Sequence, residues 1–210
     1  MSKITFTKTR MPAAHMGKVS DYPVLYTGKR FYKGSVLGEE EGLYLNFGGV
    51  QCGLPYTAQD SYDHTEQMRE FDAAILENDC LRATFLPGVG GKLWSLYDKR
   101  RERELLASNP VFKPCNLAIR NAWTAGGVEF NCGVRGHNPL TCDKIFAAEG
   151  VGEDGEPFLR LYAFERIRAI TYQMDFYLPE GSAFLLARMR LVNGADLPVP
   201  IYWWSNIAVP

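Results

Sequence analysis

The sequence lacks any broad excess of charge. It carries 23 Lys and Arg residues against 24 Asp and Glu residues over 210 positions, for a formal net charge of −1. Because attachment to nucleic acid or to anionic lipid depends on accumulated positive charge, we expect neither as a partner. A signal-peptide core and a hydrophobic run long enough to span a bilayer are both missing from the sequence, which predicts a cytoplasmic protein.

Paired cysteine motifs are also missing. The cysteines form an odd set without CxxC spacing or neighbouring histidines, at positions Cys52, Cys80, Cys115, Cys132 and Cys142. This set fits neither a disulfide framework nor a zinc site, so reduced and mostly buried thiols are expected. A nucleophilic role for Cys132 is disfavoured because no paired base is evident. Acidic residues are scattered without the spacing of an oxygen cage, and we predict neither a metal nor a cofactor.

Helical periodicity is scarce. Residues 60–71 are the only fair candidate for an amphipathic helix, and their apolar positions are sparse. Period-two alternation is strong instead. In residues 183–192 the apolar positions Leu185, Ala187, Met189 and Leu191 alternate with Arg188 and Arg190, which predicts a strand with one dry and one wet face. Residues 158–169 show the same pattern, with Leu159, Leu161, Ala163 and Ile167 on one side.

Shorter strands are predicted between glycine and proline residues, at 4–7, 24–26, 43–47, 73–76, 81–86, 92–97, 117–120, 173–178 and 201–204. Hairpin turns are predicted at 78–79, 87–88, 150–155 and 193–196, and residues 99–104 are expected to form a solvated hairpin loop. Many short strands with frequent turns favour an all-β sandwich or barrel. A composition shift near residue 70 separates weakly periodic residues 1–70 from residues 71–210. No linker divides them, so we expect one domain over 1–210, with 1–70 packed on the sandwich.

The chemistry-bearing residues concentrate in the run from Trp123 to Asn131 and the following turn at 135–139, which includes Arg135 and His137. Paired glycines at 126–127 allow a bend or a close backbone approach. Glu129 and His137 could exchange protons with sugar oxygens if they converge. Trp123 could cover the apolar face of a pyranose or have a structural role. The alternatives are that Glu129 points to water on a plain strand and that His137 bonds its own turn.

A second aromatic group lies at Tyr202, Trp203 and Trp204. Because side chains alternate along a strand, one tryptophan is expected in the core while the other could stack on a sugar; a structural role for both is the alternative. Asn206 is a candidate hydroxyl partner, as is Asn131. Arg120 could bind the carboxylate of a uronic acid or pair with Glu129.

Three longer stretches, 76–98, 120–131 and 190–206, resemble one known group of proteins. The first resembles the opening hairpin of the galactose-mutarotase-like superfamily. The Gly-Gly-Val-Glu-Phe-Asn and Tyr-Trp-Trp-Ser-Asn runs resemble a bacterial domain of unknown function from that superfamily, often found ahead of tetratricopeptide repeats. The resemblance covers 71–210 and implies the N-terminal part of an antiparallel β-supersandwich. It also implies a fragment of a longer protein, without the base that sugar epimerases of this superfamily carry on later strands.

The leading functional hypothesis is a carbohydrate-active domain, epimerase-like or glycoside-processing, that binds a sugar or an oligosaccharide. Glu129 and His137 would form its acid and base pair, with no metal involved. The alternatives are a non-catalytic carbohydrate-binding module and a structural scaffold. Since a cut sandwich leaves unpaired strand edges, a homodimer through those edges is also expected.

Overall fold

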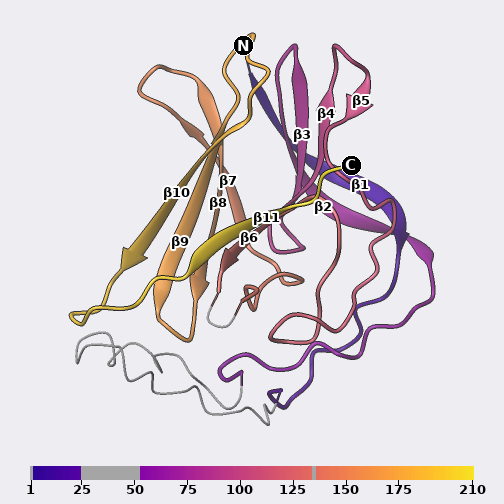
Figure 1. Ribbon diagram of the computed structural model, residues 1–210, viewed down its shortest axis with the longest axis vertical. Helices are drawn as coiled ribbons and strands as arrows, with labels where there is room; N and C mark the ends of the chain where they lie inside the picture. The colour runs from indigo at the N-terminus through magenta and orange to yellow at the C-terminus, as the bar shows by residue number, and fades with distance from the viewer. Residues whose placement is uncertain (1, 25–52, 134–135) are drawn as a thin grey trace.

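Two antiparallel β-sheets form the regular structure of the residues that the computed structural model describes, 2–24, 53–133 and 136–210 (Figure 1). The larger sheet contains β1 (Lys3–Ala13), β2 (Gln67–Glu77), β3 (Leu81–Leu86), β4 (Lys92–Asp98), β5 (Arg103–Glu104), β6 (Val128–Cys132) and β11 (Trp203–Ile207). The smaller contains β7 (Phe146–Val151), β8 (Pro157–Glu165), β9 (Ile170–Tyr177) and β10 (Leu186–Asn193). The described elements are all strands, which confirms the all-β sandwich. No helix in the described part of the chain is long and apolar enough to cross a membrane.

The main hydrophobic core lies between the two sheets. Strand β3 contributes Phe85 and β9 contributes Phe176, whose ring centroids are 4.5 Å apart. Strand β8 adds Leu159, Leu161 and Ala163, all buried, as the alternation in the sequence predicts. Burial of a large apolar side chain contributes about 1.5–3 kcal/mol, so these facing layers supply the main stabilisation of the sandwich.

A second hydrophobic cluster covers the outer face of the larger sheet. Leu86 of β3 and Trp94 of β4 pack there against Phe112 and Ala122. The last two belong to the segment between β5 and β6, which lies across this outer face. This packing places Trp123, at the end of the segment, beside β6.

Several strand predictions are confirmed, with longer bounds in some cases. The predicted strand at 4–7 extends to the whole of β1, which pairs with β2 over 11 residues. The turns at 78–79, 87–88 and 150–155 join neighbouring antiparallel strands, and 99–104 lies in the β4–β5 hairpin. The turn at 193–196 instead leads from one sheet to the other. The predicted strands at 24–26 and 43–47 fall mostly or wholly outside the described residues.

Residues 60–71, the one fair candidate for a helix with its sparse apolar positions, form no helix, because 67–71 pair with β1 as part of β2. Two predictions about local structure are wrong. Residues 117–120 form a turn, closed by the Asn121 amide donating to the Ala118 carbonyl over 2.8 Å. The strand at 158–169 divides after Glu165, whose carboxylate accepts the amides of Ile167 and Arg168 and so stabilises a turn before β9. No predicted strand corresponds to β7.

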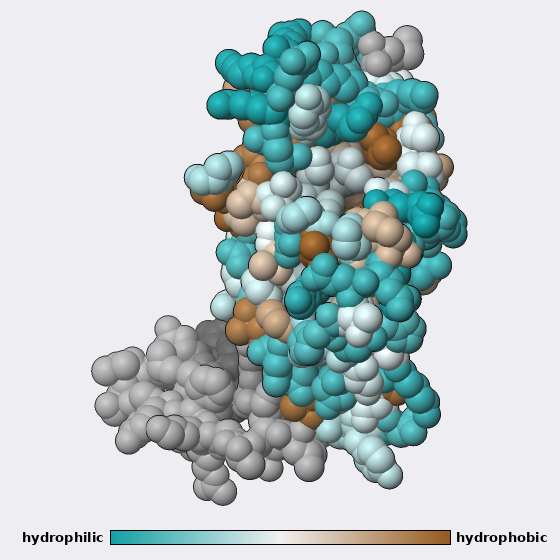
Figure 2. All heavy atoms as spheres, turned by 90° about the vertical axis from the view of Figure 1, so that its right-hand side faces the viewer, coloured by the Kyte–Doolittle hydropathy of each residue, from teal (hydrophilic) through white to brown (hydrophobic). Residues whose placement is uncertain are grey.

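The expected dry face of β10 is wrong as well. Leu185 and Leu191 are half-buried, but Ala187 and Met189 are exposed, Met189 by 39%. Strand β10 is the last strand of its sheet, so one of its edges and much of its apolar side remain uncovered. The opposite side of the molecule, on the right of Figure 1, is mainly hydrophilic, with hydrophobic residues in separate spots (Figure 2).

Candidate functional site

The register between β6 and β11 sorts the predicted site residues onto two faces. Glu129 lies opposite Asn206, and Asn131 lies opposite Trp204. Directly opposed residues in an antiparallel pair share a face, so these four side chains lie on the outer face of the larger sheet. Trp203 lies on the other face, where it packs on the main core and on the Tyr172 ring at 6.1 Å. The two tryptophans are therefore divided as the alternation predicts.

Glu129 is buried, with 6% of its surface exposed, and three donors surround its carboxylate. The indole Nε1–H of Trp123 donates to Oε2. The amide Nδ2 of Asn131 donates to Oε1 over 2.7 Å, and the Nδ1 of His137 lies 2.5 Å from the same oxygen. The structure thus excludes the alternative that Glu129 points to water. Hydrogen bonds to a charged group contribute about 1.5–3 kcal/mol each, which offsets part of the desolvation cost.

The imidazole of His137 lies close to two indole rings. Its ring centroid is 5.7 Å from that of Trp123 and 5.2 Å from that of Trp204. Because a carboxylate only accepts hydrogen bonds, Nδ1 carries the hydrogen directed at Glu129, and Nε2 is the nitrogen left for proton exchange. No described residue hydrogen-bonds Nε2, and 18% of the side chain is exposed. The 2.5 Å contact leaves no room for a sugar between Glu129 and His137, so they form a coupled pair instead of two groups on opposite sides of a ligand.

The turn that carries His137 is fixed by Asn138, which was not among the predicted site residues. Its backbone amide donates to Asn131 Oδ1 over 2.7 Å, and its Nδ2 donates to the Tyr172 hydroxyl over 3.0 Å. Tyr172 belongs to β9, so the turn is bonded to both sheets. Trp204 adds a bond from its Nε1 to the Gly136 carbonyl over 3.1 Å. An asparagine before proline is a common turn signal, and it was the available clue to this role.

Paired glycines direct the chain into β6, as the sequence predicts. Gly126 and Gly127 have φ angles of 83° and 65°, in the left-handed region that side-chain-bearing residues avoid. A Cβ atom at Gly127 would collide with the carbonyl oxygen of Leu93 in β4. The second glycine therefore permits both the backbone conformation and the close approach of β4.

A small cleft opens beside this network. Its volume is about 210 Å³, and it is lined by Trp123, Glu129 and Asn206 together with Lys92, the first residue of β4. Its volume lies below the range of about 300–1,000 Å³ for drug-sized ligands, so it would hold a small ligand such as one sugar ring. Lys92 was also not among the predicted site residues, because a lysine at the start of a predicted strand gives no sign that it is buried.

Arg120 is not part of this cluster. Its guanidinium donates to Asp143 Oδ2 over 2.6 Å and to the Thr57 carbonyl over 2.7 Å. The alternative pairing of Arg120 with Glu129 is therefore wrong, since Asp143 takes that position. Arg135 lies outside the described residues. Asn131 belongs to the cluster but is fully buried, so it positions Glu129 and does not present its amide to a ligand.

The described cysteines Cys80, Cys132 and Cys142 are buried free thiols, as expected, whereas Cys115 is exposed. Burial raises the pKa of the Cys132 thiol to about 12, which opposes a nucleophilic role. In the described part of the chain, no three His, Cys, Asp or Glu side chains are grouped as metal ligands.

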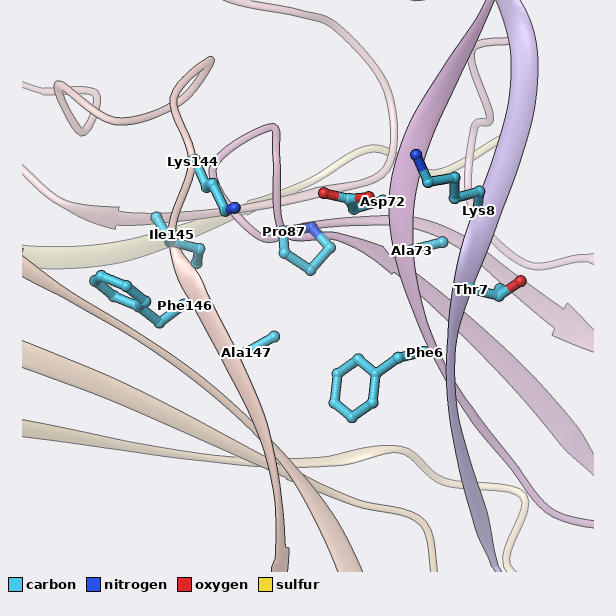
Figure 3. A pocket seen from close by; sticks show the side chains of 10 residues that line it. All are labelled: Phe6, Thr7, Lys8, Asp72, Ala73, Pro87, Lys144, Ile145, Phe146 and Ala147. Carbon is cyan, nitrogen blue, oxygen red and sulfur yellow. The ribbon is translucent and has the colours of Figure 1, made fainter.

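A larger hollow of about 540 Å³ lies elsewhere, between β1, β2 and the start of β7. Figure 3 shows Phe6, Ile145 and Phe146 around it, with Lys8, Asp72 and Lys144 toward one end. Its walls are mainly apolar, and none of the predicted site residues lines it. The smaller cleft remains the better candidate because it is lined by Glu129, which is bonded to His137.

Fold and site together define a class: an antiparallel β-sandwich that carries a carboxylate–imidazole pair close to two indoles on the outer face of one sheet. A family model described as a domain of unknown function, DUF5107, matches residues 48–210. The chain therefore belongs to the DUF5107 family. The family match begins at residue 48, whereas the resemblance seen in the sequence begins at residue 71.

The fold is also similar to a crystal structure of a TPR-domain containing protein from Parabacteroides distasonis, with a TM-score of 0.76 and 19% sequence identity. The alignment covers 100% of this chain and 32% of that protein. This chain thus spans about a third of the length of the protein it matches. Both comparisons agree with the expected domain of unknown function found ahead of tetratricopeptide repeats.

Proposed function

We propose that this chain is a carbohydrate-active domain in which His137 exchanges a proton with an oxygen of a sugar ring and Glu129 orients the imidazole. The observation that carries the proposal is the buried pair itself, with Glu129 Oε1 2.5 Å from His137 Nδ1 and the indole rings of Trp123 and Trp204 next to the imidazole. Indole faces suit the apolar side of a pyranose. The resemblance to galactose-mutarotase-like proteins points to the same class of substrate.

The chemistry follows from the hydrogen bonds of Glu129. An ionised Glu129 fixes the hydrogen on Nδ1 and stabilises the imidazolium that forms when Nε2 accepts a proton. In epimerase-like chemistry Nε2 would take the proton of the anomeric hydroxyl and return it to the ring oxygen, as the C1–oxygen bond of the ring breaks and a carbonyl forms. In glycoside hydrolysis it would take a proton from the water that attacks C1 and give it to the leaving oxygen. Asn206, exposed on the same face, supplies amide groups for a neighbouring hydroxyl.

The test is the variant Glu129→Gln, measured in the intact protein against a panel of sugars and oligosaccharides. We expect turnover to fall by about 10²–10⁴-fold while sugar affinity changes little, because only the orienting charge is removed. Glu149→Gln, on an exposed position of β7, is the matched control. Unchanged turnover in Glu129→Gln would contradict the assigned role. Binding that is lost in Trp204→Ala, without turnover of any sugar, would favour the non-catalytic binding module.

A structural scaffold is the second candidate, and the exposed strand β10 favours it. A shallow cavity of about 150 Å³ lies between Phe130, Met174 and Phe176 on one side and Ala187 and Met189 on the other. Uncovered apolar side chains beside an unpaired strand edge favour association with another strand. The proposed partner is a second copy of this chain. Light scattering should show a dimer that Met189→Lys dissociates, and a wild-type monomer at high concentration would exclude this contact.

A further inference from the structure

Lys92 is an unusual component of the cleft beside Glu129. Only 4% of the residue is exposed, although its side chain carries an ammonium group. The Nζ donates to the carbonyl oxygen of Thr124 and to its Oγ1, the latter over 3.2 Å. It also lies 5.4 Å from the centroid of the Trp123 ring. Lys92 therefore contacts the same indole that donates to Glu129.

The partners of Lys92 do not neutralise it. Two neutral oxygens and an aromatic face surround the Nζ, and no described carboxylate forms an ion pair with it. Burial lowers the pKa of Lys92, and the negative charge of Glu129 opposes that shift. An ammonium has three hydrogens, and the two bonds to Thr124 leave one for another acceptor. Desolvation of an isolated ammonium is costly, so an anion in the cleft would be bound by a group already removed from water.

The charges around the cleft also favour an anionic ligand. Glu129, the carboxylate that lines the cleft, is already bonded to three donors, whereas the Nζ of Lys92 has only neutral partners. Arg120, the cation expected from the sequence to bind a carboxylate, is bonded to Asp143 instead. Lys92 is thus the described cation that lines the cleft.

We propose that the cleft accepts a sugar that carries a carboxylate, a hexuronic acid, with the carboxylate bound by Lys92. This inference rests on the proposed carbohydrate function and specifies the substrate class. One ring with its carboxylate is in keeping with the 210 Å³ volume. The acid would lie against Trp123 with its carboxylate toward Lys92 and hydroxyls toward Asn206.

The test compares the affinity of the wild-type protein for D-glucuronate and D-galacturonate with its affinity for D-glucose and D-galactose, by calorimetry. We expect the uronates to bind at least 10-fold more tightly, and their affinity to fall with added salt while that for neutral sugars does not. Neutral sugars that bind as tightly as uronates would overturn the inference and leave the proposed function intact. If no sugar of either kind binds, both are overturned.

The variant Lys92→Met tests the residue directly, because methionine keeps much of the side-chain length and tolerates burial. It should lose the preference for uronates, with the affinity for uronates falling at least 10-fold more than the affinity for neutral sugars. Lys144→Met, an exposed lysine beside the larger hollow, should keep the preference. A preserved preference in Lys92→Met would overturn the assignment of Lys92. The wild-type comparison needs no variant and decides the substrate class even if Lys92→Met does not fold.

Discussion

Replacing Asn131 by Asp changes one atom group inside the Glu129 network. The Nδ2 that donates to Glu129 Oε1 over 2.7 Å becomes an oxygen, while Oδ1 still accepts the Asn138 amide. Shape and volume stay nearly constant. The folded protein must then hold two carboxylates in contact at a fully buried position, and one of them must stay protonated or the pair must separate.

The free-energy cost of keeping that carboxyl protonated sets the size of the expected destabilisation. An aspartate in the unfolded chain has a pKa near 3.9, so keeping a carboxyl protonated at pH 7 costs up to about 4 kcal/mol, at about 1.36 kcal/mol per pH unit. The same sum gives about 1 kcal/mol at pH 4.5. Two unit charges 4 Å apart at an effective dielectric constant of 20 repel by about 4 kcal/mol, so ionising both offers no cheaper solution. The contact between the two carboxyls raises the pKa of one of them in the folded variant. The variant therefore keeps its stability below the pKa of the unfolded chain and loses stability as the pH rises.

Urea unfolding at pH 4.5 and pH 7 measures this difference for Asn131→Asp against the wild type. We expect a small loss of stability at pH 4.5 that grows by about 2–3 kcal/mol at pH 7, with unchanged denaturant dependence. Asn206→Asp, exposed on the neighbouring strand, should change stability by less than about 0.5 kcal/mol at either pH. An equal loss at both pH values would refute the reasoning, since no buried like-charge pair would then exist.

Three further outcomes are expected. Gly127→Ala should destabilise the protein by at least about 1–2 kcal/mol, because its φ is 65° and its Cβ would collide with neighbouring backbone, whereas Gly194→Ala, in open space, should change little in the same thermal unfolding experiment. Arg120→Met should lower stability by about 2–3 kcal/mol and leave sugar affinity unchanged, so lost affinity in a folded variant would contradict its structural role. Iodoacetamide at pH 8 should label Cys115 and not Cys132 in the native protein, as mass spectrometry would show, because Cys132 is buried with a pKa of about 12.

Alternation in the sequence predicted which side of a strand is apolar, but not whether anything covers it. In β8 the apolar side faces the opposite sheet, so Leu159 and Leu161 are buried as predicted. In β10 the same period-two pattern occurs, yet Met189 is exposed because β10 is the outermost strand of its sheet. Position within a sheet depends on long-range pairing, which a local pattern does not contain.

The candidate site was also predicted only in part from the sequence. The glycine pair and the run after it predicted a backbone bend that presents Glu129, and the structure brings Glu129, His137, Trp123 and Trp204 together. The partner of Arg120 could not be predicted, because Asp143 is 23 positions away and nothing local marks it. Lys92 was missed for a related reason: its burial depends on the segment between β5 and β6, which approaches β4 only in the folded chain.

The candidate site depends on the register between β6 and β11. Glu129 and Trp204 share a face only because Asn206 lies opposite Glu129. Sliding β11 by one residue would turn Trp203 and Ser205 outward and turn Trp204 and Asn206 toward the core. Inserting a single residue at the start of β11 would therefore separate Trp204 and Asn206 from Glu129 with almost no change in composition. A second inserted residue would restore the facing of the strand but not its original partners.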